Sequence, residues 1–169
     1  MKTSAKYLTT FFIVLSVLSA TILWLTREFD LSSQSMFADQ PNAIWYILMH
    51  VGIIMSFFIL SSSFRGTIYQ LVSFSSIATL AFDLMDFRWL HNITTAILFI
   101  IACICLTLYS PNRKLSWVLV GISSLAFISG IIGLLGSSGV FLGEVIAEFL
   151  LSIGILLIVW KKDEINLVD

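Results

Sequence analysis

Six ionisable side chains lie within or beside long apolar stretches of this sequence. The chain has two histidines, His50 and His91, and both fall in such stretches. The accompanying carboxylates are Asp83, Asp86, Glu144 and Glu148. The two glutamates are four residues apart, so on a helix they share one face. Imidazole and carboxylate groups in an apolar environment are costly and typically bind a ligand, a proton or a metal ion.

Two enzymatic interpretations follow from the histidines. Zinc could be held by His50, His91 and a carboxylate such as Asp83 or Asp86, with Glu148 as the general base. A b-type haem could instead be held by His50 and His91 from two parallel helices. The histidines are predicted at different depths and no short ligand motif joins them. We therefore expect no cofactor and keep zinc or haem as the alternative.

A purely structural interpretation is also open for each group. His50 and Glu148 could form one hydrogen bond between helices. Glu144 could be an acid at a helix start, where the helix dipole favours negative charge. The aspartates at positions 83 and 86 could belong, with Arg88, to a solvated loop that holds a local ion pair.

The composition identifies the environment of these groups. Of 169 residues, 59% are hydrophobic and 11% are charged, and the mean hydropathy is +1.02. A soluble domain averages about 45–50% apolar and about 25% charged residues. The net charge of -1 provides no basic surface for nucleic acid. The sequence therefore predicts an integral membrane protein whose first partner is the lipid bilayer.

Six stretches approach the roughly 20 apolar residues that a helix needs to cross a bilayer. They are Tyr7–Thr26, Ala43–Ser62, Thr67–Leu84, Trp89–Tyr109, Leu115–Leu135 and Val140–Trp160. We expect a single all-α domain over residues 1–169, with six transmembrane helices in one polytopic bundle. Short connections make consecutive helices antiparallel neighbours.

The basic residues predict the orientation. With both termini in the cytoplasm, seven of the nine lysines and arginines are cytoplasmic, as the positive-inside rule requires. Arg27 and Arg88 are the two outside. Cleavage of the first stretch as a signal peptide is the alternative. Its apolar run is longer than the usual core of about 7–15 residues, so we expect it to be retained.

In this orientation the six ionisable residues lie on the outer side or in the outer half of the membrane. His50 is about 10 Å below the outer end of the second span, at 1.5 Å per residue. Glu148 is similarly deep, so we predict that these two residues pair. The other four would lie nearer the surface. The result would be one outward-facing polar pocket, lined by the second, third, fourth and sixth spans.

Small residues suggest where partners could pack. The spacing of Ser129 and Gly133 is typical of close helix contacts, through which other membrane subunits or a second copy could associate. Cys103 and Cys105 lie on nearly opposite faces of a helix, so we interpret both as packing residues.

The polar motifs, read in order, resemble a known family. Asp30-Leu31-Ser32 follows the first span, and Phe82-Asp83-Leu84-Met85-Asp86 with His91 joins the third and fourth. The sixth span opens near Gly143 and carries Glu148. The chain resembles, over nearly its whole length, the six-span prokaryotic family catalogued as domain of unknown function 998. It is more distantly similar to the damage-regulated autophagy modulators.

The sequence departs from that family's pattern at four places. It lacks a glycine after Leu31 and a proline after Phe82. Val145 stands where the family has glycine, and Phe149 where it has the arginine beside the glutamate. The resemblance implies the six-helix fold, a bacterial cytoplasmic membrane and the outward polar cluster, but no reaction.

Together these observations favour a non-enzymatic role. We expect a pocket that binds a lipid headgroup or small molecule, or an accessory subunit of a larger membrane complex. The alternative is a metal- or haem-dependent membrane enzyme.

Overall fold

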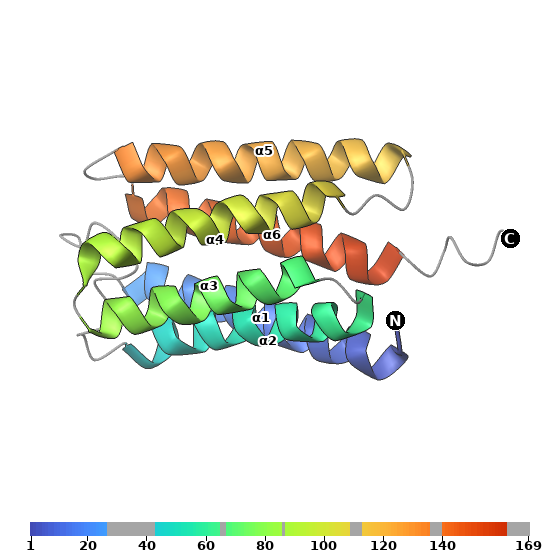
Figure 1. The fold of residues 1–169 in the computed structure, drawn as a ribbon, viewed down its shortest axis with the longest axis horizontal. Helices are drawn as coiled ribbons and strands as arrows, with labels where there is room; N and C mark the ends of the chain where they lie inside the picture. Colours follow the sequence, from blue (N-terminus) through green and yellow to red (C-terminus); the bar gives the residue numbers. More distant parts are fainter. Residues whose placement is uncertain (27–42, 65–66, 86, 109–112, 136–139, 162–169) are drawn as a thin grey trace, which may run out of the picture.

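The structure, a computed structural model, describes residues 1–26, 43–64, 67–85, 87–108, 113–135 and 140–161. These residues form six α-helices (Figure 1). The helices are α1 Thr3–Thr26, α2 Ala43–Phe64, α3 Thr67–Leu84, α4 Arg88–Leu108, α5 Arg113–Leu135 and α6 Val140–Lys161. Each contains one predicted stretch almost completely, because continuous apolar runs without proline satisfy their backbone hydrogen bonds internally.

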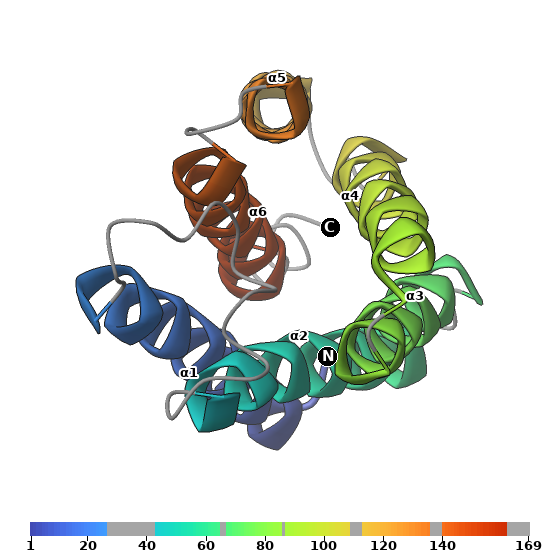
Figure 2. The same cartoon turned by 90° about the vertical axis from the view of Figure 1, so that its left-hand side faces the viewer.

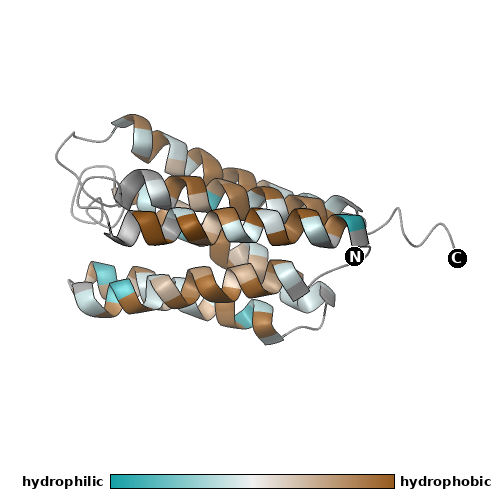
Figure 3. Ribbon diagram, turned by 90° about the horizontal axis from the view of Figure 1, so that it is seen from above, coloured by the Kyte–Doolittle hydropathy of each residue, from teal (hydrophilic) through white to brown (hydrophobic). Residues whose placement is uncertain are grey.

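Apolar and polar side chains are distributed over the bundle as in a membrane protein. Four helices are long and apolar enough to span a bilayer, namely α1 to α4, and α5 and α6 contain shorter described apolar segments, Trp117–Ser129 and Val145–Trp160. Large apolar side chains such as Phe11, Phe74 and Ile132 are more than half exposed. Figure 3 shows this hydrophobic colouring along the lengths of the helices. Polar side chains, in contrast, are buried between them. The chain is therefore a helical membrane protein.

The helices form a closed ring. Each helix contacts the next in sequence, and α1 also contacts α6 (Figure 2). A further contact between α4 and α6 leaves α5 on the outer side of these two helices. Helix α1 begins and α6 ends at the same end of the bundle (Figure 1). The ring thus brings four helices, α2, α3, α4 and α6, around a common interior.

Helices α1 and α2 approach each other closely at Gly52. A Cβ atom built there would lie 2.5 Å from the Phe12 carbonyl oxygen and 2.7 Å from Ser16 Cβ. These atoms belong to the backbone or lie next to it, so they cannot rotate away. Gly52 and Ser56 have the small-residue spacing typical of close helix contacts in membranes, and Ser56 Oγ donates to the Gly52 carbonyl at 2.8 Å.

The ring is closed between α1 and α6 by a second group of contacts, around Trp160. The indole Nε1 donates a hydrogen bond to Thr10 Oγ1 at 3.0 Å. The Tyr7 ring packs edge-on against the indole at 5.6 Å between centroids, and Lys6 Nζ lies 5.7 Å from the indole centroid. Amphipathic side chains of this kind are typical of the membrane–water boundary.

Candidate functional site

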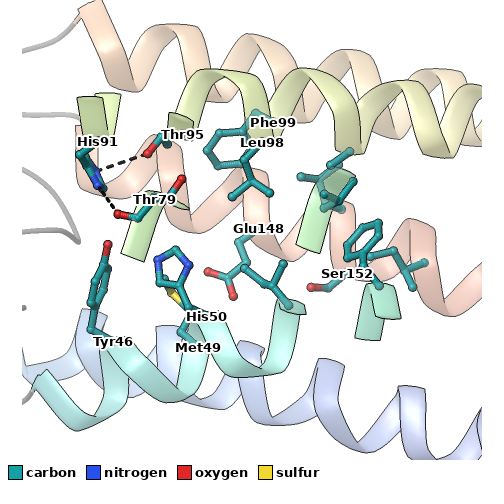
Figure 4. A pocket seen from close by; sticks show the side chains of 16 residues that line it. Tyr46, Met49, His50, Thr79, His91, Thr95, Leu98, Phe99, Glu148 and Ser152 are labelled. Carbon is teal, nitrogen blue, oxygen red and sulfur yellow. Dashed lines mark hydrogen bonds between the residues drawn. The ribbon is translucent and has the colours of Figure 1, made fainter. Parts of the chain in front are cut away.

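A cavity of about 70 Å³ lies inside the ring, between α2, α3, α4 and α6 (Figure 4). These are the four helices that the depths of the polar residues predicted. Nine of the sixteen lining residues are apolar, so the wall is less polar than we expected. His50, His91 and Glu148 reach the cavity from three different helices, α2, α4 and α6.

His50 is held in the first half of α2 by a neighbouring helix. Its Nδ1 lies 2.9 Å from Ser76 Oγ of α3, and the side chain is 3% exposed. One turn earlier on α2, the Tyr46 ring packs edge-on against the imidazole, with 4.8 Å between ring centroids. These contacts fix the direction of the ring toward the cavity, as Figure 4 shows.

His91 lies in the first turn of α4, which follows α3 almost directly. Its Nδ1 is 3.3 Å from the Thr79 carbonyl oxygen and 3.7 Å from Asp83 Oδ1, and its Nε2 is 3.4 Å from Thr95 Oγ1. A carbonyl oxygen can only accept, so Nδ1 carries the proton in this contact. In the neutral ring Nε2 then accepts from the Thr95 hydroxyl. Asp83 lies beside Nδ1, beyond hydrogen-bond distance, and its side chain is mostly buried.

Glu148 enters the cavity from the middle of α6. Its Oε1 accepts a 2.5 Å hydrogen bond from Ser16 Oγ of α1, and the residue is 6% exposed. Ser16 is the residue whose backbone packs against Gly52. The close approach of α1 and α2 therefore also positions the hydroxyl that holds the carboxylate. Three helices meet at this point.

The hydroxyl of Thr79 has no hydrogen-bond partner among the described residues, although the residue is only 2% exposed. Thr79 lines the same cavity. An unpartnered hydroxyl in an apolar interior costs about 1–3 kcal/mol in mutational data. This cost indicates that water or a ligand group supplies the missing partner.

The structure brings together most of the predicted site. His50, His91 and Glu148 line the cavity, and Asp83 contacts His91. Asp86 and the side chain of Glu144 lie outside the described residues. The direct pairing of His50 with Glu148 stays a prediction, because the hydrogen bonds that the structure gives them are to Ser76 and Ser16.

The serines and threonines of the site were not predicted. Serine is frequent in these helices, and a hydroxyl bears no charge that would require a partner. The one available signal was helix position: Ser76, Thr79 and Asp83 follow one another at intervals of three and four residues, so they share a face of α3.

The metal and haem alternatives stay hypotheses. Within the described part of the chain, no three residues among histidine, cysteine, aspartate and glutamate are grouped so that they could hold a metal ion. The two imidazoles do face a common cavity. The two cysteines are free thiols within α4, with Cys105 buried and Cys103 partly buried, as expected of packing residues.

Comparisons of the chain with protein-family models, curated protein sequences and solved structures find no match. The resemblance to the family of domain of unknown function 998 therefore stays a prediction. The function has to be inferred from the geometry of the site.

Proposed function

We propose that this six-span membrane protein binds a small molecule or a lipid headgroup in the cavity between α2, α3, α4 and α6. The observation that supports this most is the convergence of His50, His91 and Glu148 on one cavity from three helices. Ionisable residues within a membrane bundle usually line binding sites or transport pathways. Apolar walls with a few convergent polar groups are typical of ligand sites.

The size of the cavity limits the ligand. About 70 Å³ is far below the roughly 300–1,000 Å³ of sites for drug-sized molecules. The ligand is therefore a small molecule, or the end of a larger one, with a short apolar body and one hydrogen-bonding group. The Thr79 hydroxyl is a partner for that group.

We take the membrane to be the bacterial cytoplasmic membrane, because the family that the chain resembles is prokaryotic. Both termini are then cytoplasmic, and the turn between α3 and α4 faces outward. Single cysteines at Ser4 and Met85, which are both exposed, test this orientation in a chain without Cys103 and Cys105. An impermeant maleimide added to intact cells should label position 85 and leave position 4 unlabelled. The reverse pattern would contradict the orientation.

Native mass spectrometry of the protein in mild detergent tests ligand binding. Ala102 lines the cavity and is 3% exposed, so Ala102→Leu fills it. Ala96→Leu, on the same helix but not among the lining residues, is the matched control. A lipid retained by the wild type and the control but lost from Ala102→Leu supports a lipid headgroup as the ligand.

If no lipid is retained, thermal unfolding in the presence of 1-butanol tests whether the cavity binds a small molecule. The alcohol should stabilise the wild type and Ala96→Leu more than Ala102→Leu, because binding to the folded state raises its stability. Equal responses in all three proteins, with no retained mass, would refute a binding site. A retained metal or haem would favour the enzymatic alternative, and an intact partner protein the accessory-subunit role.

A further inference from the structure

The polar residues of the cavity follow one another along the bundle axis. From the end where α3 meets α4, the order in Figure 4 is His91 with Thr95, then Thr79, then His50, then Glu148. Asp83 contacts the first member of this row at 3.7 Å. The row therefore leads from an acid near the end of α3 to an acid in the middle of α6.

The spaces between these groups are suited to water. A cavity needs about 10–15 Å³ to hold one water molecule, so about 70 Å³ has room for several. Water is retained where it has polar partners, and Thr79 Oγ1 is a buried hydroxyl on this cavity without a described partner. The imidazoles and the carboxylate supply further partners.

We propose that the cavity holds a short chain of water and that Glu148 is a proton-binding site in exchange with the Asp83 end of the bundle. The carboxylate of Glu148 takes up a proton that comes from water outside the membrane, and it returns the proton by the same route. Each transfer along the chain makes one O–H or N–H bond and breaks another. No other reactant is required.

The hydrogen-bond donors and acceptors of the row permit such transfer. The neutral His91 ring donates from Nδ1 to the Thr79 carbonyl and accepts at Nε2 from the Thr95 hydroxyl. For release, Nε2 takes the proton of the Thr95 hydroxyl, which cavity water replaces, and Nδ1 gives its proton to Asp83 Oδ1 at 3.7 Å, because the Thr79 carbonyl cannot pass a proton on; uptake reverses these steps. Ser16 Oγ donates to Glu148 Oε1, which holds this oxygen in place while the carboxyl group changes protonation.

The charged groups around Glu148 are few in the described part of the chain. His50 of α2 and His91 of α4 line the same cavity as Glu148, and Asp83 of α3 contacts His91. Helix α1 contributes the Ser16 hydroxyl, whereas its Lys6 lies at Trp160, the last described side chain of α6. We therefore expect the protonation of Glu148 to be coupled to that of the two histidines on the same cavity, so that the pH response belongs to the group.

Beyond Glu148 the row ends. The lining residues that follow on α6 are Leu151, Ser152 and Ile155, so one hydroxyl stands among apolar side chains. We therefore infer exchange from one end only, without conduction across the membrane. This inference requires no ligand and extends beyond the proposed binding function.

Infrared spectroscopy of the purified protein in lipid, without added ligand, tests the proposal. A protonated carboxyl group has its own C=O stretching band. We expect a wild-type band that decreases as the pH rises and is lost in Glu148→Gln, whose amide can still accept from Ser16. A wild type without a titrating band, or a band unchanged by Glu148→Gln, would overturn the proton-binding site, whereas the ligand experiments would be unaffected.

A pair of hydroxyl deletions tests the route. Thr79→Val removes the hydroxyl between His91 and His50, and Ser152→Ala removes one on the other side of Glu148 (Figure 4). After a pH jump, the band should respond several-fold more slowly in Thr79→Val and at the wild-type rate in Ser152→Ala. Equal rates in the two variants would overturn the route through Thr79, and circular dichroism verifies that both are folded.

Discussion

Replacing Gly52 by alanine tests the close packing of α1 and α2, because the steric effect of the new Cβ atom opposes the gain in helix propensity. The new Cβ would lie 2.5 Å from the Phe12 carbonyl oxygen, whereas ordinary contacts begin at 3.4 Å. The helices must therefore move apart by about 0.9 Å, the difference between these distances. Overpacking of this kind costs about 1–3 kcal/mol. Displacing Ser16 also weakens its hydrogen bond to Glu148, which adds about 0.6–2 kcal/mol.

Alanine also favours the helix, by about 0.8–1.0 kcal/mol relative to glycine. The net expectation for Gly52→Ala is a loss of about 0.6–4 kcal/mol in the free energy of unfolding. Gly121→Ala is the matched control, because a Cβ there has no neighbour within 4 Å. It should stabilise the protein by the propensity gain alone. Gly154→Ala meets Leu106 Cδ1 at 2.7 Å, the mobile end of a side chain, so its effect should be small.

Unfolding in mixed micelles with increasing sodium dodecyl sulfate measures these differences, with tryptophan fluorescence and circular dichroism as two probes. The opposite signs for positions 52 and 121 are the critical result. A Gly52→Ala protein as stable as the wild type would show that α1 and α2 can separate without cost. The reasoning from the close contact would then be wrong.

Three further variants follow from contacts described above. Ser16→Ala leaves Glu148 without its described hydroxyl donor and should lower the free energy of unfolding by about 0.6–2 kcal/mol in the same titration; no change would show that this bond contributes nothing. Thr10→Val removes the acceptor of the Trp160 indole at an exposed site, so the loss should stay below about 1 kcal/mol, with a shift in tryptophan emission. Phe74 is 56% exposed near the middle of α3, so Phe74→Asp should reduce membrane insertion, at a cost of about 2.5–3.5 kcal/mol, whereas Phe74→Leu should insert normally. Equal insertion of the two Phe74 variants would contradict a lipid-facing position.

The helices could be predicted from the sequence because each is a nearly continuous apolar run. The four helices around the cavity could also be predicted, because a histidine or glutamate deep in a span almost always faces the interior of the bundle. His50 and Glu148 were found in this way, whereas His91 was predicted nearer the surface of the same pocket. Their depth along the bundle follows from sequence position, and depth alone selected the correct helices.

What could not be predicted was the rotation of each helix about its axis, which decides the partners. Depth placed His50 and Glu148 at similar levels and suggested a direct pair. The structure gives each a serine from a further helix, Ser76 and Ser16. A hydroxyl in a membrane helix can donate its hydrogen bond to a backbone carbonyl of the same helix, as Ser56 does to Gly52. Serine positions alone therefore do not reveal contacts between helices. Small-residue spacing drew attention to Ser129 on α5, whereas the close approach described here is at Gly52.

The closure of the ring by α1 and α6 has a consequence for biosynthesis. Ser16 and Glu148 are 132 positions apart, so the ribosome delivers the hydroxyl long before the carboxylate that it binds. During synthesis the first five helices can pair successively with their neighbours, but the cavity has no wall on the α6 side. A chain arrested before its last helix thus exposes to lipid the serines and histidines that are buried in the complete protein. The quality-control proteases of the membrane could distinguish such an incomplete chain from the finished one by these exposed polar groups.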